Sequence, residues 1–181
     1  MNKKIALMLA EGFEEIEVVV PIDVLRRLEF NLVIAGEKDL VRGSHGLEIK
    51  CDSRINSIRS EDFDCIILPG GMPGSLNLMN NKNVINIVKE MNKNKKLICA
   101  ICAAPIALSQ AGVIKGVKIT SHPSVKDKLS ESNYSGSNVE QDANIITGKG
   151  PGVSFEFTCR IAQALGKKRE SEELMKDMFV G

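Results

Sequence analysis

The sequence predicts an α/β fold in which helices cover both faces of a mostly parallel sheet. The apolar runs within Lys3–Ala10 and Asp64–Leu68 lack the polar alternation of a half-exposed strand, which is typical of strands buried on both faces. Such runs alternate along the chain with segments of helical periodicity, the order that builds parallel sheets. A chain of 181 residues is long enough for one well-cored domain and short for two. We therefore expect a single domain over residues 1–181.

The first half of the chain contributes two strands, one helix and a hairpin. Lys3–Ala10 and Asn31–Gly36 are predicted strands because each carries a continuous apolar run. Glu14–Leu28 is a predicted helix, and Leu40–Lys50, in which two glycines mark the turns, is a predicted short hairpin. The apolar residues expected to form the buried face of the helix recur at helical spacing: Ile16, Val19, Val20, Val24 and Leu28.

The second half continues the alternation, and Gly or Pro residues punctuate it. The predicted strands, each a short apolar run, are Asp64–Leu68, Lys95–Ile101, Val117–Thr120 and Asn144–Thr147. The predicted helices are Asn83–Met91, Ala103–Ala111, the short Ser124–Leu129, Gly152–Leu165 and Ser171–Phe179.

Composition excludes several classes of protein. The formal net charge is +1 and 26% of residues are charged, which gives no basic surface for nucleic acid or an anionic membrane. The apolar run after Lys3 and Lys4 is too short for a signal peptide, and no stretch approaches the ~20 apolar residues of a membrane helix. We expect a cytoplasmic protein whose five cysteines, an odd number, form no disulfide framework.

Cys102 is the strongest candidate for a reactive group. It stands where a predicted strand ends and a helix begins, and Ala100, Ala103 and Ala104 surround it. Nucleophile elbows need small residues at these offsets because the strand-to-helix turn is tight. Unpaired N–H groups at the helix start would favour the thiolate, so the sequence predicts a lowered pKa for this thiol. The alternative is a buried, inert cysteine.

The spacing Cys99-Ala100-Ile101-Cys102 also matches the C-x-x-C redox motif. If both cysteines lie on the strand, their Cα atoms are roughly 10 Å apart and their side chains point to opposite faces. A disulfide needs Cα atoms within about 7 Å. The spacing therefore disfavours a thioredoxin-like dithiol.

Three further side chains are candidates for the same rim of the sheet, beyond the carboxyl ends of the strands where ligands bind in such folds. Glu17 lies beside the predicted buried stripe of the first helix. Burial there would raise the pKa of its carboxyl, which could then donate a hydrogen bond to a thiolate. The alternative is a surface residue near the helix start. His122 follows a strand and precedes a proline, and His45 lies in the predicted hairpin. Either histidine is otherwise an ordinary loop residue.

The sequence predicts no cofactor and no metal. It contains only two histidines and no evident carboxylate cluster, which disfavours catalytic zinc. No G-x-G-x-x-G follows a strand and no Walker loop is present, so a nucleotide cofactor is not indicated.

Six segments together resemble the ThiJ/PfpI superfamily, and within it the DJ-1 branch. They occur in the family's order and span nearly the whole chain, which makes the combination highly specific. The segments are residues 10–17 (AEGFEEIE), 21–27 (PIDVLRR), 68–71 (LPGG), 100–105 (AICAAP), 120–123 (TSHP) and 150–157 (GPGVSFEF).

The resemblance implies a flavodoxin-like three-layer sandwich and a homodimer. It implies that Cys102 is the reactive cysteine, Glu17 its hydrogen-bonding glutamate and His122 a nearby histidine. The backbone N–H groups of Gly71 and Ala103 correspond to the pocket for an oxyanion. Members of this branch act as glutathione-independent glyoxalases on methylglyoxal and as deglycases of glycated groups, and have chaperone and oxidative-stress roles.

Two departures disfavour other members of the superfamily. The PfpI-type peptidases carry a histidine directly after the nucleophile, where this chain has Ala103, and the glutaminases need a downstream His-x-Glu, which neither histidine forms. Two functional interpretations remain. Cys102 is the nucleophile of a cofactor-independent glyoxalase or deglycase, or it is the oxidisable thiol of a redox-sensing chaperone. The expected substrate is a small dicarbonyl or a glycated protein.

Overall fold

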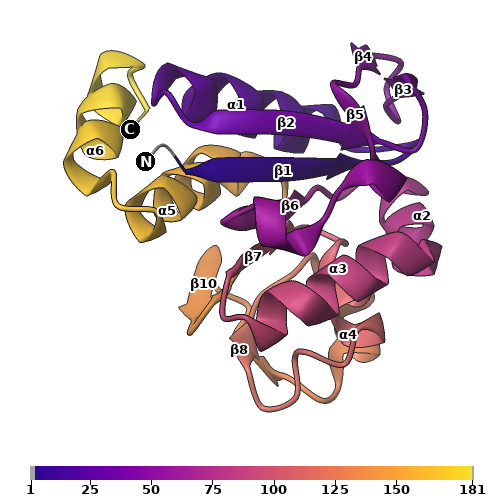
Figure 1. Cartoon of the computed structure of the whole chain (residues 1–181). Helices are drawn as coiled ribbons and strands as arrows, with labels where there is room; N and C mark the ends of the chain where they lie inside the picture. Colours follow the sequence, from indigo (N-terminus) through magenta and orange to yellow (C-terminus); the bar gives the residue numbers. More distant parts are fainter. Residues whose placement is uncertain (1–2, 181) are drawn as a thin grey trace.

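The computed structural model describes residues 3–180 and places a seven-stranded sheet at the centre of the molecule, in the order β10-β11-β7-β6-β1-β2-β5 (Figure 1). All neighbouring pairs are parallel except β10 and β11. The strands are β1 (Lys4–Leu9), β2 (Asn31–Gly36), β5 (Ser53–Arg54), β6 (Cys65–Leu68), β7 (Leu97–Ile101), β10 (Val139–Asp142) and β11 (Ile145–Gly148). The predicted α/β class with a mostly parallel sheet, a flavodoxin-like sandwich, is confirmed.

Helices cover both faces of this sheet (Figure 1). On one face lie α1 (Glu15–Arg27) and α5 (Ser154–Ala164), with α6 (Lys168–Asp177) packed on α5. On the other lie α2 (Gly74–Asn80), α3 (Lys82–Lys93) and α4 (Pro105–Gln110). Two small two-stranded units stand outside the sheet: β3 (Leu40–Arg42) with β4 (Glu48–Lys50), and β8 (Lys118–Ile119) with β9 (Asn133–Tyr134).

The two cores follow from the alternation of side chains along each strand. In β1, Ile5, Leu7 and Leu9 contribute to the core under α1 and α5, whereas Ala6 and Met8 face α2, α3 and α4. All five side chains are fully buried. Burying one such Leu, Ile or Met side chain contributes about 1.5–3 kcal/mol. A continuous apolar run is therefore what a strand between two helical layers requires.

The buried face of α1 differs from the predicted one. Ile16 and Val19 are 51% and 43% exposed, while Glu17, Val18 and Pro21 are buried together with Val24 and Leu25. The apolar residues of this helix outnumber the positions on one face, so their spacing alone did not fix which face packs inward. The buried stripe includes the carboxyl group of Glu17 itself.

Other differences concern short elements. The helix α2 and the antiparallel edge strand β10 were not predicted, because α2 begins with Gly-Ser and β10 consists of Val-Glu-Gln-Asp. Short one-turn helices also occur at Ile55–Ser57, Ser60–Asp62 and Pro151–Val153, whereas the predicted short helix Ser124–Leu129 is present as a 3₁₀-helix over Pro123–Leu129. The predicted strand over Val117–Thr120 exists as β8, although it pairs with β9 outside the main sheet.

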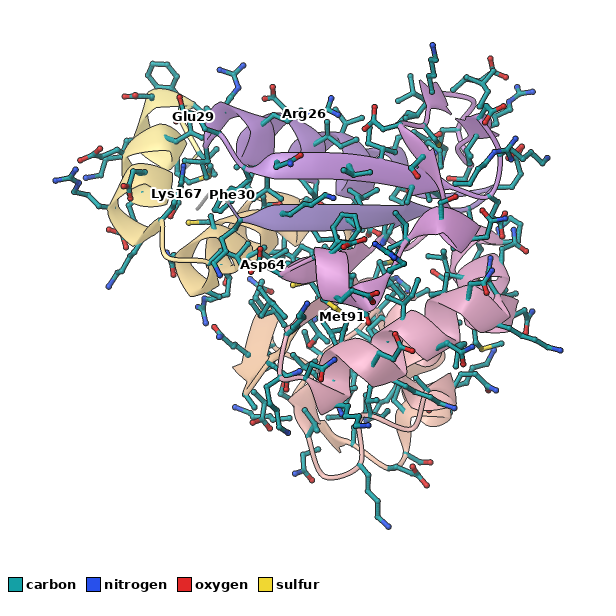
Figure 2. All side chains as sticks on the ribbon, viewed as in Figure 1. Arg26, Glu29, Phe30, Asp64, Met91 and Lys167 are labelled. Atoms are coloured by element: carbon teal, nitrogen blue, oxygen red, sulfur yellow. The ribbon has the colours of Figure 1, made fainter. Side chains whose placement is uncertain are left out.

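The C-terminal helices are fastened to the end of α1. Lys167, between α5 and α6, donates a hydrogen bond to the carbonyl of Leu28, and its ammonium lies 5.1 Å from the centre of the Phe30 ring (Figure 2). The cation thus caps a helix C-terminus while it stacks on an aromatic face. Within residues 3–180, no helix combines the length and apolar character that a membrane span requires.

Candidate active site

The candidate site lies where β1, β6 and β7, three neighbouring strands, end at the same edge of the sheet. Cys102 directly follows β7, Gly70 and Gly71 follow β6, and α1 starts shortly after β1. The carboxyl edge of a parallel sheet is where ligands bind in such folds. Sequence positions that are up to 85 residues apart therefore meet at one place.

Cys102 occupies a strained turn. Its φ of 62° lies in the left-handed region, which costs a residue with a Cβ roughly 1–2 kcal/mol. Two hydrogen bonds hold it there: its N–H donates to the Gly148 carbonyl at 2.9 Å, and its carbonyl accepts from the His122 N–H at 2.8 Å. Strain of this kind persists only where the surroundings impose it and is frequent at functional sites. The predicted elbow is present at the predicted residue.

Small residues around the turn are a steric requirement. A Cβ on Gly70 would lie 2.5 Å from Oε2 of Glu17 and 2.6 Å from the Cβ of Cys102. A Cβ on Gly71, whose φ is +90°, would collide with the backbone of Phe13 and Glu14. The Pro-Gly-Gly turn therefore lets β6 approach both the cysteine and the start of α1.

Glu17 is fully buried at this junction. Its Oε2 accepts a 2.7 Å hydrogen bond from the Gly70 N–H. Its Oε1 is buried without a hydrogen-bond partner of standard geometry, and the carboxyl interacts with the thiol of Cys102. A carboxyl in this position is an exception among buried polar groups, most of which are fully paired. Oε1 of Glu17 is therefore available to accept a proton.

Burial dominates the titration of this pair. Burial raises the pKa of Glu17 to about 7, although the hydrogen bond from Gly70 and the contact with the Cys102 thiol oppose the rise. Burial and the adjacent Glu17 carboxylate raise the pKa of Cys102 to about 12, while the N–H groups of Gly71 and Ala103 lower it in part. The repulsion of two negative charges means that the pair keeps one proton between them above neutral pH.

The predicted lowering of the Cys102 pKa is therefore wrong. Burial of the thiol and the adjacent Glu17 carboxyl raise its pKa, and the N–H groups of Gly71 and Ala103 offset these two effects only in part. Cys102 is therefore a thiol beside a proton acceptor, the Glu17 carboxyl, rather than an isolated thiolate. Attack by sulfur then requires proton transfer to Glu17, which is general-base activation of a nucleophile.

Two backbone donors face the sulfur. The N–H groups of Gly71 and Ala103 both interact with Cys102 and stabilise negative charge there. Ala103 is buried, and the tight Gly71 turn fixes its own N–H. Preorganised N–H groups beside a nucleophile are what an oxyanion needs.

His122 is placed in part where it was expected. Its backbone N–H donates a hydrogen bond to the Cys102 carbonyl. Its ring lies beside Gly150, since a Cβ built on that glycine would be 4.0 Å from Cδ2 of His122. The side chain is exposed, and its Nδ1 is 2.7 Å from the Ser124 hydroxyl. The ring is therefore anchored through Nδ1, which leaves Nε2 for other contacts.

His45 lies on the β3–β4 hairpin and is held by the first turn of α1. Its Nδ1 is 2.8 Å from Oε2 of Glu15 and 3.7 Å from Oε2 of Glu14. Burial opposes ionisation of Glu15, but hydrogen bonds from His45 outweigh this effect and lower the pKa of Glu15 to about 2. The sequence did not predict this carboxylate–histidine cluster, because the hairpin and the helix are 30 residues apart.

The remaining cysteines are separate from the site. Cys65 and Cys99 are fully buried, with sulfur atoms 3.7 Å apart, and all five cysteines are free thiols. Cys99 belongs to the core under α1 and, like Cys102, is a free thiol.

Two contributors to the site were not predicted. The Gly70 N–H binds Glu17, and the Gly148 carbonyl binds the N–H of Cys102. Both act through backbone atoms, for which residue type gives no signal. Only the Gly-Gly pair at the end of a strand pointed to a close backbone approach.

Comparison with known proteins agrees with the geometry. The family model described as the DJ-1/PfpI family matches residues 3–164. Protein dj-1beta of Drosophila melanogaster is 36% identical over 99% of this chain and 98% of its own length. Its crystal structure superposes with a TM-score of 0.96 and 35% identity, and covers 100% of both chains.

Two further relatives have names that state an activity. The glutathione-independent glyoxalase DJR-1.2 of Caenorhabditis elegans is 36% identical over 97% of this chain and 96% of its own length. The deglycase PH1704 of Pyrococcus horikoshii is 33% identical over 70% of this chain and 76% of its own. The sequence resemblance, the site geometry and these comparisons converge: the chain belongs to the DJ-1/PfpI family.

Proposed function

We propose that this protein is a cofactor-independent glyoxalase and deglycase that acts on methylglyoxal or on glycated amino and thiol groups. One observation carries the proposal: a fully buried carboxyl, Glu17, lies against the thiol of a strained elbow cysteine, with one oxygen left unpaired. The activities named for the nematode and archaeal relatives support the same reaction class. A role in carbonyl or oxidative stress follows from such substrates.

In this mechanism, the Glu17 carboxylate accepts the thiol proton as the sulfur of Cys102 attacks the aldehyde carbon of methylglyoxal. A C–S bond forms, the carbonyl π bond becomes an alkoxide, and the N–H groups of Gly71 and Ala103 stabilise that charge. Protonation of the alkoxide yields a hemithioacetal.

The next steps move one proton between adjacent carbons. Glu17 or His122 removes the hydrogen from the former aldehyde carbon and returns a proton to the neighbouring carbon, which leaves a lactoyl thioester on Cys102. Water then cleaves the C–S bond, releases lactate and restores the thiol. The sum is addition of one water to methylglyoxal, with no oxidant or reductant consumed.

Deglycation would use the same nucleophile. Adducts of methylglyoxal with an amine or a thiol hold the same three carbons, and removing them as lactate frees the amine or thiol. The exposed edge of the sheet admits a substrate attached to a larger molecule, since Cys102 is only partly buried.

A specific observation favours one second function, that of a redox-sensing chaperone. The same N–H groups and the protonated form of Glu17 are donors that would stabilise a sulfinate on Cys102. This function needs oxidation but no turnover, so a kinetic measurement separates the two.

We also propose a homodimer that uses α1. Ile16, Val19 and Leu47 are about half exposed, and a cavity of about 470 Å³ between α1 and the hairpin is lined by Val19, Leu47 and neighbouring residues. Apolar residues grouped in this way on a surface are typical of an interface.

The proposal is tested by lactate formation from methylglyoxal under reducing conditions, without glutathione. We expect turnover by the unaltered protein and a loss of more than about 10³-fold in Cys102→Ser, because removal of a nucleophile removes the covalent route. Cys159→Ser, which changes a half-buried thiol elsewhere, is the matched control. Absence of turnover in the unaltered protein, or full turnover in Cys102→Ser, would contradict the proposal.

A further inference from the structure

The two histidines of the chain face opposite kinds of hydrogen-bonding partner at Nδ1. Nδ1 of His45 lies 2.8 Å from Oε2 of Glu15, a carboxylate oxygen that can only accept, so this nitrogen carries a hydrogen. Nδ1 of His122 lies 3.2 Å from the backbone nitrogen of Ser124, whose N–H can only donate, so this nitrogen carries none. The Ser124 hydroxyl, 2.7 Å from Nδ1 of His122, is then a second donor to it.

The place of His122 in the fold requires this acceptor role. His122 is the N-cap of the short helix Pro123–Leu129, and its ring accepts from the Ser124 N–H. That N–H belongs to the first turn of the helix, where backbone donors have no partner within the helix. A hydrogen on Nδ1 would place two donors against each other and leave the backbone N–H unpaired.

The acceptor role of Nδ1 determines what the other ring nitrogen can do. A neutral imidazole carries one N–H, so in His122 that hydrogen is on Nε2. Within residues 3–180, no protein group is hydrogen-bonded to this nitrogen. Nε2 can therefore donate to a ligand. A general base would need a free lone pair, and the only one on the ring is already shared with Ser124.

Two contacts place the ring at the edge of the Cys102 turn. The backbone N–H of His122 donates to the Cys102 carbonyl at 2.8 Å, and the ring lies beside Gly150. Gly150 comes two residues after Gly148, whose carbonyl binds the N–H of Cys102. The His122 side chain is exposed, so a substrate at this edge of the sheet can reach it.

We propose that His122 donates a hydrogen bond through Nε2 to the ketone oxygen of methylglyoxal, and that Ser124 holds the ring in the tautomer that can do so. This assignment rests on the proposed function and separates the roles of its two candidate groups. Glu17 moves the proton between the carbons, and His122 stabilises charge on oxygen, as a neutral imidazole can. Ser124 is a positioning residue, because it acts through the ring.

Proton transfer between the two carbons creates the charge that such a donor stabilises. Glu17, ionised again once the hemithioacetal has formed, takes the hydrogen of the former aldehyde carbon as a proton. The electron pair of that C–H bond forms a double bond to the ketone carbon, and the carbonyl π pair moves to the ketone oxygen. Glu17 then returns the proton to the ketone carbon, while the hydroxyl proton of the neighbouring carbon passes to the charged oxygen. The product is the lactoyl thioester, and His122 keeps its own proton throughout.

The tautomer is tested without turnover by ¹H–¹⁵N correlation spectra of the imidazole rings in the full chain under mildly alkaline conditions. We expect the His122 hydrogen on Nε2 in the unaltered protein. In Ser124→Asp the carboxylate places an acceptor at the hydroxyl position, so we expect the form with hydrogen on Nδ1 to increase. His45→Gln removes the other set of signals and so assigns the spectrum. A hydrogen on Nδ1 of His122 in the unaltered chain would overturn the proposal.

The role of Nε2 is tested by kinetics of lactate formation. In His122→Gln the amide nitrogen lies near the position of Nε2 and can donate but cannot act as a base, whereas asparagine is one methylene shorter. We expect kcat to stay within about tenfold of the unaltered protein in His122→Gln and to fall about 10²-fold in His122→Asn, because loss of one such donor has that effect. Equal losses in the two variants would overturn the donor role.

The role of Ser124 has its own variants. Ser124→Asp should lower kcat about tenfold, and Ser124→Thr, which keeps the hydroxyl, should recover most of that loss. Ser130→Asp adds the same charge at an exposed serine at the other end of the short helix and is the matched control. Circular dichroism checks that each variant is folded. Unchanged kcat in Ser124→Asp would refute the positioning role. Failure of the proposed function looks different, because the unaltered protein then forms no lactate whatever the imidazole spectrum shows.

Discussion

The two edges of the central sheet carry different kinds of surface. At the amino edge lies the largest of the cavities described, about 560 Å³, lined by Lys3, Asp64, Lys95, Lys96 and their neighbours. Three of its charged side chains have partners: Asp64 accepts from Lys3 and from the Lys4 N–H, both at 2.9 Å, and Lys96 donates to two carbonyls (Figure 2 labels Asp64). At the carboxyl edge, Cys102 is strained and Glu17 is buried with an unpaired oxygen.

The larger cavity and the perturbed side chains thus lie at opposite edges of the sheet. At the amino edge, the ion pair between Lys3 and Asp64 is partly exposed, so it contributes little, about 0–1 kcal/mol. At the carboxyl edge, the strained backbone of Cys102 and the desolvated carboxyl of Glu17 cost free energy, which packing elsewhere must offset. Perturbed groups of this kind gather where chemistry occurs.

The sharpest test of this contrast changes one carboxyl to an amide at each edge. We expect Glu17→Gln to lower turnover of methylglyoxal by about 10²–10⁴-fold, because general acid–base catalysis contributes that much. Asp64→Asn at the amino edge should remain within about twofold of the unaltered protein. Initial rates of lactate formation check both. A loss below about tenfold in Glu17→Gln would remove Glu17 from the chemistry.

A second test adds one carbon at the carboxyl edge. Gly70→Ala places a Cβ against Glu17 and Cys102, so we expect about a 10²-fold loss of turnover and a loss of about 1–3 kcal/mol in the free energy of unfolding. Gly152→Ala, where an added Cβ meets nothing within 4 Å, should change stability by less than about 0.5 kcal/mol. Urea denaturation measures both. Equal stability of the two variants would mean that Gly70 does not pack as described.

A third test concerns the exposed face of α1. In Val19→Glu we expect the dissociation constant of the dimer to be at least about tenfold higher than in the unaltered chain, because a charge would be buried in an apolar interface. Phe179→Glu, at an apolar residue that is 94% exposed and lies near the C-terminus, should leave the mass unchanged. Light scattering at micromolar concentration provides the measurement. A monomeric mass for the unaltered protein would refute the dimer.

Much of this arrangement could be predicted from the sequence. The continuous apolar runs indicated buried parallel strands, and Cys102 between small residues indicated the elbow. Glu17 was a candidate because it lies beside the predicted buried stripe of α1, but the apolar residues of this helix fill more than one face. Which face packs inward depends on the sheet beneath the helix, and that choice determines how deeply Glu17 is buried.

The electrostatics of the site could not be predicted in the same way. The pKa of Cys102 depends on how deeply its thiol is buried and on the distance between that thiol and the Glu17 carboxyl, and tertiary packing determines both. The cluster of Glu14, Glu15 and His45 likewise arises when a hairpin folds onto a helix. Local pattern carries no information about contacts across 30 residues.

The measurement that tests the central claim most directly is the pH dependence of kcat/KM for methylglyoxal. Glu17 must be ionised to accept the proton of Cys102, and its pKa is raised to about 7. We predict that kcat/KM rises with pH through a limb near pH 7, that His122→Asn keeps this limb, and that Glu17→Gln lacks it. A limb that persists unchanged in Glu17→Gln, or that disappears in His122→Asn, would contradict the account.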